Sequence, residues 1–339
     1  MKEELTLKFL NVCLGLAIKN INSDKLPNTV HVKGRFAPSP TGRMHAGNIY
    51  SYLCTWLITK KLEGKIVLRI EDLDVERSKS EYIDLIQSDF NMLGLTWDEG
   101  PYFQACDSAQ ERYKNIFDCF QNNTYPCFCT RAELKNQSAP HFGEKRVYSG
   151  KCRNLSQEQI AELKKQKNAS YRLKVPNRTI EFCDGIQGVY SQNLASECGD
   201  FVIKRADGLF AYQLAVVADD AAQGISVVVR GYDLINSTPQ QIYLHELLDA
   251  KTPDYWHVPL FVNSEGRRLS KRDKDASLDE LLSKYKTPEG LLGHIAYIGK
   301  ITDRDVACSA KDLLEEFNLD SFSERIKREV GVLQPIVFS

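Results

Sequence analysis

The chain contains 339 residues, and its 44 lysines and arginines nearly balance 45 aspartates and glutamates, which leaves a formal charge of −1. This balance excludes a polybasic nucleic-acid tail or an acidic solvating tail as a dominant feature. With 42% hydrophobic and 26% charged residues, the composition is that of a globular protein, and the length suggests about two domains. No run of about 18 apolar residues occurs, so we expect no membrane contact, and ten scattered cysteines favour a reducing, cytoplasmic location over a disulfide framework.

The first hundred residues alternate between strand and helix patterns. A strand is predicted over 30–36, and a buried strand over 65–70 (KIVLRI). Between them, apolar side chains from Ile49 to Leu57 recur on one helical face. The proline- and glycine-rich stretch 37–47 must then be a loop. This order predicts a parallel strand, helix, strand unit.

The remainder of the chain contains an irregular segment and a return to the same alternation. Residues 126–153 hold three closely spaced cysteines and no clear period, which indicates an insertion. Strands predicted over 201–204 and 225–230 would resume the sheet, and a helix is predicted over 239–248. Helical patterns dominate residues 288–339. Cys183 and Cys198 have no metal-ligand spacing, so we place them in the core.

The loop between the first strand and helix is the obvious candidate for a ligand site. Residues 35–48 have the sequence RFAPSPTGRMHAGN, and open α/β sheets bind ligands at such strand-to-helix loops. Gly42 and Gly47 would let a ligand approach the backbone, and free N–H groups at the helix start favour phosphate. The simpler interpretation is that His45 only caps the helix. The sequence has neither a P-loop nor a G-x-G-x-x-G fingerprint.

A second candidate is the basic run NSEGRRLSKRDK at 263–274, with five basic residues against two acidic ones. Such a run is usually a solvated face. Because Gly266 would act as a hinge, this run could instead close over a polyphosphate, with Lys271 as a mobile cation.

Taken together, these segments resemble a known enzyme family. RFAPSPTG followed by HAGN is similar to the HIGH signature of class I aminoacyl-tRNA synthetases in its glutamate-specific form, and RRLSKR resembles the KMSKS signature. RIEDLD (69–74), LFAYQLAVVADDAAQG (209–224) and VVRGYDLINSTPQQIYL (228–244) resemble further blocks of that family in the same order. The resemblance implies an α/β fold: a Rossmann-like parallel sheet with a zinc-binding insertion and a helical C-terminal part.

Within that family the chain resembles the glutamyl-queuosine tRNA(Asp) synthetases, shortened paralogues of glutamyl-tRNA synthetase. This implies a ligase that activates L-glutamate with ATP in the absence of tRNA and transfers it to the queuosine base at the wobble position in the anticodon loop of tRNA(Asp). Two alternatives remain open. One is a truncated glutamyl-tRNA synthetase that esterifies the tRNA 3′ end, and the other is a zinc-containing RNA-binding paralogue without catalysis.

The resemblance also implies roles for individual residues. Glutamate offers two carboxylates and an ammonium, so a selective pocket needs about two cations and one anion. The implied glutamate-binding residues are Arg35, Ser39, Glu71, Tyr212 and Arg230, where Glu71 would meet the ammonium and Arg230 the side-chain carboxylate. His45, Asn48 and Lys271 would bind ATP together with Mg²⁺, with His45 and Lys271 as the catalytic pair. Asn48 replaces the second histidine of the signature, which leaves its contribution open.

The cysteine cluster predicts a metal site, although buried free thiols are the alternative. Cys127 and Cys129 would point to one side of an extended chain, and Tyr148 and Cys152 could share one face of a turn. The resemblance implies structural Zn²⁺ on these four residues, with tyrosine as an unusual ligand. Because a phenol has a pKa near about 10, His141 is a rival for the fourth position.

These interpretations divide the chain into five parts. We expect no anticodon-binding domain among them, and we expect a monomer. The parts are an N-terminal extension (1–30), the first half of the catalytic domain (31–125), the zinc-binding insertion and connecting region (126–200), the second half with the KMSKS-like loop (201–285), and the helical C-terminal part (286–339).

Overall fold

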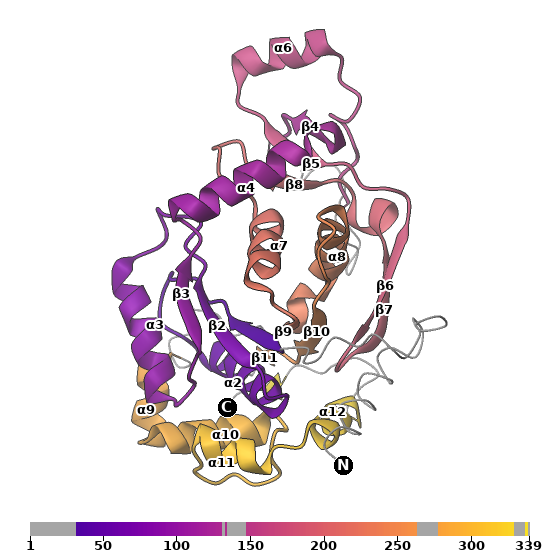
Figure 1. The fold of residues 1–339 in the computed structure, drawn as a ribbon. Helices are drawn as coiled ribbons and strands as arrows, with labels where there is room; N and C mark the ends of the chain where they lie inside the picture. The colour runs from indigo at the N-terminus through magenta and orange to yellow at the C-terminus, as the bar shows by residue number, and fades with distance from the viewer. Residues whose placement is uncertain (1–31, 131–132, 134–146, 263–276, 329–335, 338–339) are drawn as a thin grey trace, which may run out of the picture.

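The computed structural model describes residues 32–130, 133, 147–262, 277–328 and 336–337. The predicted extension 1–30, the basic run at 263–274 with Lys271, and the rival ligand His141 lie outside these residues. At the centre, parallel strands from two distant parts of the chain form one layer (Figure 1). The parallel strands are β1 (Lys33–Phe36), β2 (Lys65–Ile70), β3 (Glu99–Phe103), β9 (Val227–Gly231) and β10 (Asp254–Val258).

The two parts of the layer meet where β1 lies beside β9. The strands β1, β2 and β3 pair in that order, and β9 pairs with β10, all in parallel. The backbone N–H of Ser226, just before β9, donates to the carbonyl of Lys33 at 2.9 Å, and the N–H of Lys33 donates to the Ser226 hydroxyl at 2.9 Å. The parallel strand, helix, strand unit expected from the sequence is therefore confirmed, and its sheet continues into a segment almost two hundred residues downstream.

Helices cover both faces of this layer, as in other α/β proteins. On one face lie α2 (Ala46–Lys61), α3 (Ser80–Met92), α9 (Leu278–Tyr285), α10 (Pro288–Ile298), α11 (Ala310–Glu316) and α12 (Leu319–Arg328). On the other lie α4 (Asp107–Cys119), α7 (Tyr212–Gln223) and α8 (Thr238–Leu247). The predicted helices at 239–248 and in the C-terminal part are confirmed. In the described part of the chain, none of the helices has the length and apolar character needed to cross a membrane.

The alternation of each strand decides which side chains point at which helices. Phe36, Leu68 and Val229 pack in the core on the α2 side. Val67 and Val228 belong to the core on the α7 and α8 side. Because successive residues of a strand face opposite ways, Arg35, Arg69 and Arg230 all lie on the α7 and α8 side. Three guanidinium groups from three strands therefore share one face, near the carboxyl ends of the strands.

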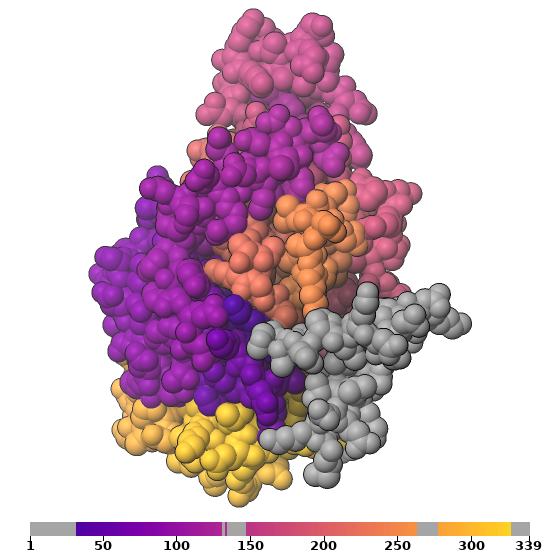
Figure 2. Space-filling view, in the orientation of Figure 1, coloured from indigo at the N-terminus to yellow at the C-terminus, as the bar shows by residue number. Residues whose placement is uncertain are grey.

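The central part of the chain forms a three-stranded antiparallel sheet, β4-β5-β8, a separate two-stranded hairpin and a protruding helix. Its elements are β4 (Thr124–Cys127), β5 (Ser170–Leu173), β8 (Phe201–Lys204), the hairpin β6 (Thr179–Asp184) and β7 (Gly188–Asn193), and α6 (Gln157–Gln166). Figure 2 shows α6 projecting at the end of the molecule opposite α10 and α11. The shorter elements are η1 (Gln121–Asn123), η2 (Leu194–Cys198), η3 (Tyr232–Ser237), β11 (Phe261–Val262) and β12 (Ile336–Val337).

Two expectations about this region are wrong. The strand at 201–204 does not resume the parallel sheet, because β8 pairs antiparallel with β5. Its residues alternate between buried and half-buried, as in a sheet with one covered face, whereas β9 is buried almost throughout. Cys183 is exposed rather than in the core, since its neighbours Phe182 and Asp184 occupy the inward positions of β6; Cys198 is half-buried against the core.

A network of buried charges connects α7 to the sheet. Arg69 is 1% exposed, and its guanidinium donates to Asp220 at 2.7 Å and to Gln223 at 2.9 Å. The Arg35 Nε lies 3.5 Å from the same Asp220 oxygen. The adjacent Asp219 accepts from Arg112 at 2.7 Å, from Tyr113 at 2.7 Å and from Gln104 at 2.9 Å. These carboxylates therefore hold α7 against β1, β2 and α4.

Replacing Arg69 should destabilise the protein strongly. Arg69→Met leaves Asp220 buried without its closest cation, and breaking such a pair costs about 3–5 kcal/mol in the free energy of unfolding. Arg77→Met is the matched control, because the Arg77 side chain is 79% exposed and lies 4.0 Å from its only ion-pair partner in the described residues, Asp74. Urea unfolding at neutral pH measures both variants. A similar small decrease in the free energy of unfolding in both variants would contradict a structural role for the buried network.

Candidate functional site

The signature loop after β1 ends in a capped helix. His45 is the N-cap of α2: its Nδ1 accepts the Asn48 N–H at 3.3 Å, and the Asn48 side-chain oxygen accepts the His45 N–H at 3.3 Å. His45 therefore caps α2, and Asn48 completes the cap. Since Nδ1 accepts, a neutral His45 ring carries its proton on Nε2. The first turn of α2 has no acidic residue, so its N-terminus keeps its attraction for anions.

The loop is fixed in place by an ion pair and by the chain that follows the basic run. Arg43 pairs with Asp89 of α3 at 2.9 Å and with Asp279 of α9 at 3.2 Å. The N–H of Leu278 donates to the Met44 carbonyl at 3.0 Å, beside a bridge between His45 and Ser277. The first described residue after the basic run therefore lies at the signature loop.

A cavity opens between this loop and the carboxyl ends of β1, β2 and β9. Its lining residues are Arg35, Ala37, His45, Gly47, Asn48, Ser51, Tyr52, Glu71, Tyr212, Val229, Arg230, Gly231, Asp233, Leu234, Val258, Pro259, Leu260 and Phe261. The cavity thus brings together six of the predicted site residues from four separate segments of the chain: Arg35, His45, Asn48, Glu71, Tyr212 and Arg230. Ser39 is exposed on the loop and does not line the cavity, and Lys271 lies outside the described residues.

Sequence reasoning missed several lining residues. Tyr52 lies one helical turn after Asn48 on α2, so helix spacing from the signature could have identified it. Asp233 follows β9 in the same block as Arg230, at the strand end where open sheets place their ligands. Phe261 is the second-last described residue before the basic run, so both flanks of that run lie at the site.

The two arginines of the cavity are buried but incompletely neutralised. Arg230 is 5% exposed and donates to Gln241 at 2.7 Å, to Thr238 at 2.7 Å and to His257 at 3.1 Å, all uncharged acceptors in the neutral-ring form of His257. Arg35, also 5% exposed, donates to the Val229 carbonyl at 3.4 Å and shares Asp220 with Arg69. A ligand with two anionic groups would compensate this positive charge.

Glu71 supplies the opposite charge. Its side chain is 12% exposed and lies 3.4 Å from the Arg69 guanidinium, which is already bound to Asp220. Burial raises the pKa of Glu71 above its ordinary value, even though Arg69 and Arg35 act in the opposite direction. A bound ammonium group would favour the ionised carboxylate. Two guanidinium groups and one carboxylate therefore match an amino acid with two carboxylates.

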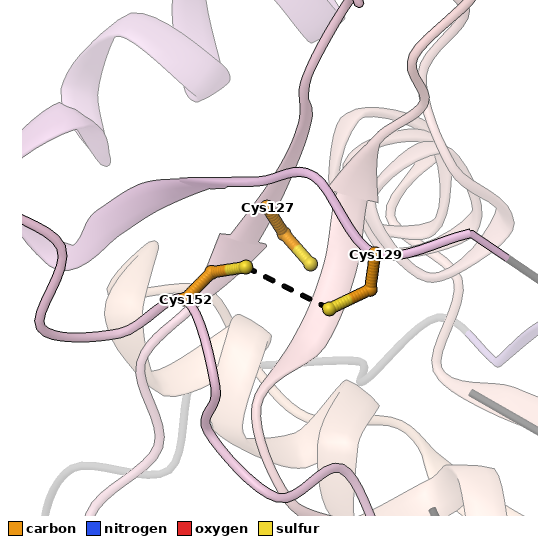
Figure 3. A group of neighbouring side chains, drawn as sticks. All are labelled: Cys127, Cys129 and Cys152. Carbon is orange, nitrogen blue, oxygen red and sulfur yellow. Dashed lines mark hydrogen bonds between the residues drawn. The ribbon is translucent and has the colours of Figure 1, made fainter. Parts of the chain in front are cut away.

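The cysteine cluster lies in the antiparallel region, and none of its residues lines this cavity; Figure 3 shows the three cysteine side chains pointing toward one another. The sulfurs of Cys127, Cys129 and Cys152 all lie within 4.8 Å of one another, and those of Cys129 and Cys152 are 3.6 Å apart. The Tyr148 hydroxyl is 3.5 Å from the sulfur of Cys127 and 3.8 Å from that of Cys129. The four groups predicted from the sequence thus converge on one point.

These distances suit a tetrahedral metal ion. Thiolates at about 2.3 Å from zinc lie about 3.8 Å apart, close to the 3.6 Å between the sulfurs of Cys129 and Cys152. Burial favours the neutral thiol of Cys127, but its hydrogen bonds with Tyr148, the Cys129 backbone and Arg172 lower its pKa below the ordinary value. Arg172 donates to the Cys127 sulfur at 3.2 Å and stacks on the Tyr148 ring. The donor set therefore fits a metal that binds thiolate.

Comparison with known proteins identifies the family of this chain. The family described as "tRNA synthetases class I (E and Q), catalytic domain" matches residues 31–329. The "Glutamyl-Q tRNA(Asp) synthetase" of Nitratidesulfovibrio vulgaris is 38% identical over 294 residues, which cover 83% of this chain and 90% of that protein. The protein of the same name from Symbiobacterium thermophilum is 38% identical over 87% of this chain and 94% of its own length.

Larger relatives match over part of their length. A "Glutamate--tRNA ligase" of Geotalea uraniireducens is 36% identical over 90% of this chain and 64% of its own length. A crystal structure of a glutamate tRNA ligase from Elizabethkingia meningosepticum "in complex with its amino acid" superimposes with a TM-score of 0.70 and 26% identity, over 86% of this chain and 65% of that one. The predicted α/β class I fold is confirmed, and the chain belongs to the catalytic-domain family of the class I tRNA synthetases for glutamate and glutamine.

Proposed function

We propose that this protein activates L-glutamate with ATP, without tRNA, and transfers it to the queuosine base at the wobble position of tRNA(Asp). The observation that carries the proposal is the cavity in which Arg35, Arg230 and Glu71 meet the capped N-terminus of α2. Relatives that share 38% identity over nine tenths or more of their length, and that are named for this activity, support it. A monomer working in the cytoplasm is part of the same proposal.

Recognition of glutamate would follow from the charges of the cavity. Glu71 binds the ammonium, Arg230 the side-chain carboxylate, and Arg35, with Tyr212 at the start of α7, the remaining polar groups of the substrate. An amino acid lacking one carboxylate would leave a buried guanidinium unpaired, which costs more than a lost contact with water. In this proposal Ser39 contributes only if the loop moves toward the substrate, since its side chain is exposed outside the cavity lining.

ATP would lie along the N-terminus of α2. The substrate α-carboxylate attacks the α-phosphate, pyrophosphate leaves, and no covalent bond to the protein is needed. His45 Nε2–H and the side-chain NH2 of Asn48 would donate to phosphate oxygens. Lys271 would add a cation from the adjoining segment. Mg²⁺ bound with ATP supplies further positive charge to the phosphates.

The distant cluster would hold Zn²⁺ in a structural role. Cys127, Cys129 and Cys152 supply thiolates and Tyr148 the fourth oxygen. The ion would then connect the end of β4 to the turn at 147–152, two segments that share the small apolar cluster around Tyr125.

The position of the transferred glutamate tests the proposal directly. Labelled glutamate, ATP and the protein are incubated with natural tRNA(Asp) that carries queuosine, and the RNA is then cut into defined fragments. We expect the label in the anticodon-loop fragment. A tRNA(Asp) transcript without queuosine is the matched control and should acquire no label.

Other outcomes would replace the proposal with one of its alternatives. Label on the 3′-terminal adenosine of an unmodified tRNA(Glu) would assign a glutamyl-tRNA synthetase activity. Absence of any glutamate-dependent exchange of pyrophosphate into ATP would leave only a binding function.

Lowering the pH should weaken glutamate binding before the substrate itself is protonated. Ammonium binding needs ionised Glu71, whose pKa is raised above its ordinary 4.5. The dissociation constant should therefore rise as the pH falls through this raised pKa, while the glutamate side chain, with an ordinary pKa of about 4.3, is still charged. Calorimetry in buffers between about pH 8 and pH 5 measures the change.

Glu71→Gln provides the control for this pH effect. The variant should bind glutamate about 10- to 100-fold more weakly at neutral pH, because a neutral amide replaces a charged partner of the ammonium. Its affinity should also be nearly independent of pH in the same window. A variant that kept the wild-type pH dependence would show that another group titrates.

Loss of one thiol should remove the metal. We expect about one zinc ion per wild-type chain and much less in Cys152→Ser, measured by elemental analysis of protein purified without chelator. Cys183→Ser is the matched control, because Cys183 is exposed outside the cluster. Tyr148→Phe should lose zinc to a chelator faster than wild type, and His141→Ala should not; the reverse result would make His141 the fourth ligand.

A further inference from the structure

Among the described residues, the Arg230 guanidinium donates hydrogen bonds only to uncharged acceptors. Its Nε donates to His257 Nε2 at 3.1 Å, one terminal nitrogen to the Gln241 amide oxygen at 2.7 Å, and the other to the Thr238 hydroxyl at 2.7 Å. A guanidinium has five N–H bonds, so two remain, one on each terminal nitrogen. Because Arg230 also lines the cavity, the remaining pair is available to grip a carboxylate in the bidentate geometry that arginine favours.

This arrangement requires one particular form of His257. An N–H from Arg230 reaches Nε2, so Nε2 must accept and the proton of the neutral ring must sit on Nδ1. Asp184 Oδ2 lies 2.5 Å from Nδ1 and accepts that proton's hydrogen bond. Burial and Arg230 lower the pKa of His257, and these effects outweigh the opposing effect of Asp184, so the ring is neutral near pH 7.

Asp184 is itself fixed, although it comes from outside the catalytic sheet. It ends β6, is 1% exposed, and its Oδ1 accepts the backbone N–H groups of Ile186 at 3.0 Å, Gln187 at 2.9 Å and His257 at 3.2 Å. Asp184 Oδ1 therefore fixes the turn of the hairpin, and Oδ2 fixes the imidazole. The β6–β7 hairpin is attached to β10 through this side chain, through the Gln187 side-chain amide, which donates to the His257 carbonyl at 2.7 Å, and through the Gly185 N–H, which donates to the Tyr255 carbonyl at 2.9 Å.

We propose that Asp184 and His257 are positioning residues that orient Arg230 and leave its positive charge for the side-chain carboxylate of the substrate. The inference rests on the proposed activation of glutamate and adds a source for its selectivity. A carboxylate placed directly on Arg230 would neutralise it and weaken the difference between glutamate and glutamine. Placing Asp184 behind an imidazole provides the orientation without that neutralisation.

Asp184→Asn tests whether Asp184 orients Arg230 through His257, with almost no change in side-chain volume. The asparagine amide can donate toward Nδ1, which moves the ring proton to Nε2, where it opposes the Arg230 N–H. We expect the KM for glutamate in pyrophosphate exchange to rise about 10- to 100-fold, with the KM for ATP within about twofold of wild type. The ratio of kcat/KM for glutamate over glutamine should fall, which a general loss of folded protein would not cause.

The matched control is Gln187→Ala. It removes a hydrogen bond between the same hairpin and the backbone of β10, but not one to the imidazole. It should keep the wild-type KM for glutamate and the wild-type preference over glutamine. Equal effects in Asp184→Asn and Gln187→Ala would overturn the inference, because attachment of the hairpin would then be the whole contribution.

A second pair of variants decides the matter if Asp184→Asn does not fold. A glutamine at 257 can place its amide oxygen near Nε2 and accept from Arg230, whereas a leucine cannot. His257→Gln should therefore recover much of the glutamate affinity lost in His257→Leu. Equal affinities would overturn the inference. Wild-type protein that bound no glutamate in direct calorimetry would instead overturn the proposed function, and with it the inference.

Discussion

Three buried arginines on one face of a parallel sheet are the constraint on which this structure depends. Arg35, Arg69 and Arg230 extend from β1, β2 and β9 toward α7 and α8 because the strand alternation places them there. Each guanidinium has lost most of its water and needs acceptors from the protein or from a ligand. The positions of α7 and of the substrate follow from how these acceptors are divided.

The protein acceptors are shared unequally among the three arginines, so that one arginine mainly stabilises the fold and another is left to bind a ligand. Asp220 accepts a short hydrogen bond from Arg69 and lies farther from Arg35, so Arg69 is the arginine most completely neutralised by the protein. Arg230 receives only uncharged partners. The most neutralised group holds the helix to the sheet, and the least neutralised one faces the cavity. A dicarboxylic amino acid bound in the cavity would therefore neutralise the positive charge that the protein leaves on Arg230.

Sequence alone could predict the parts of this site that are continuous in the chain. The signature loop, the capped helix and the block around Arg230 carry local patterns, so His45, Asn48 and Arg230 were identifiable. The edge strand β3 escaped prediction because Gly100 and Pro101 interrupt its pattern, which an edge position tolerates. The contact between Asp184 and His257 joins residues 73 positions apart and has no local signal. Such pairs depend on tertiary packing, which periodicity does not contain.

The contact between Asp184 and His257 also connects the antiparallel region to the cavity at Arg230. Arg172 on β5 holds the Cys127 sulfur, and its guanidinium donates to the Asp200 carbonyl at 2.6 Å, so the cysteine cluster and the small sheet are one bonded unit. The chain leaves β5 and, within a few residues, enters β6, the first strand of the hairpin, which ends at Asp184. A metal ion on the cysteines would therefore stabilise the base of the segment that orients Arg230. Cys127, Cys129, Tyr148 and Cys152 do not line the cavity, so an effect of the metal on substrate selectivity would have to act through the hairpin.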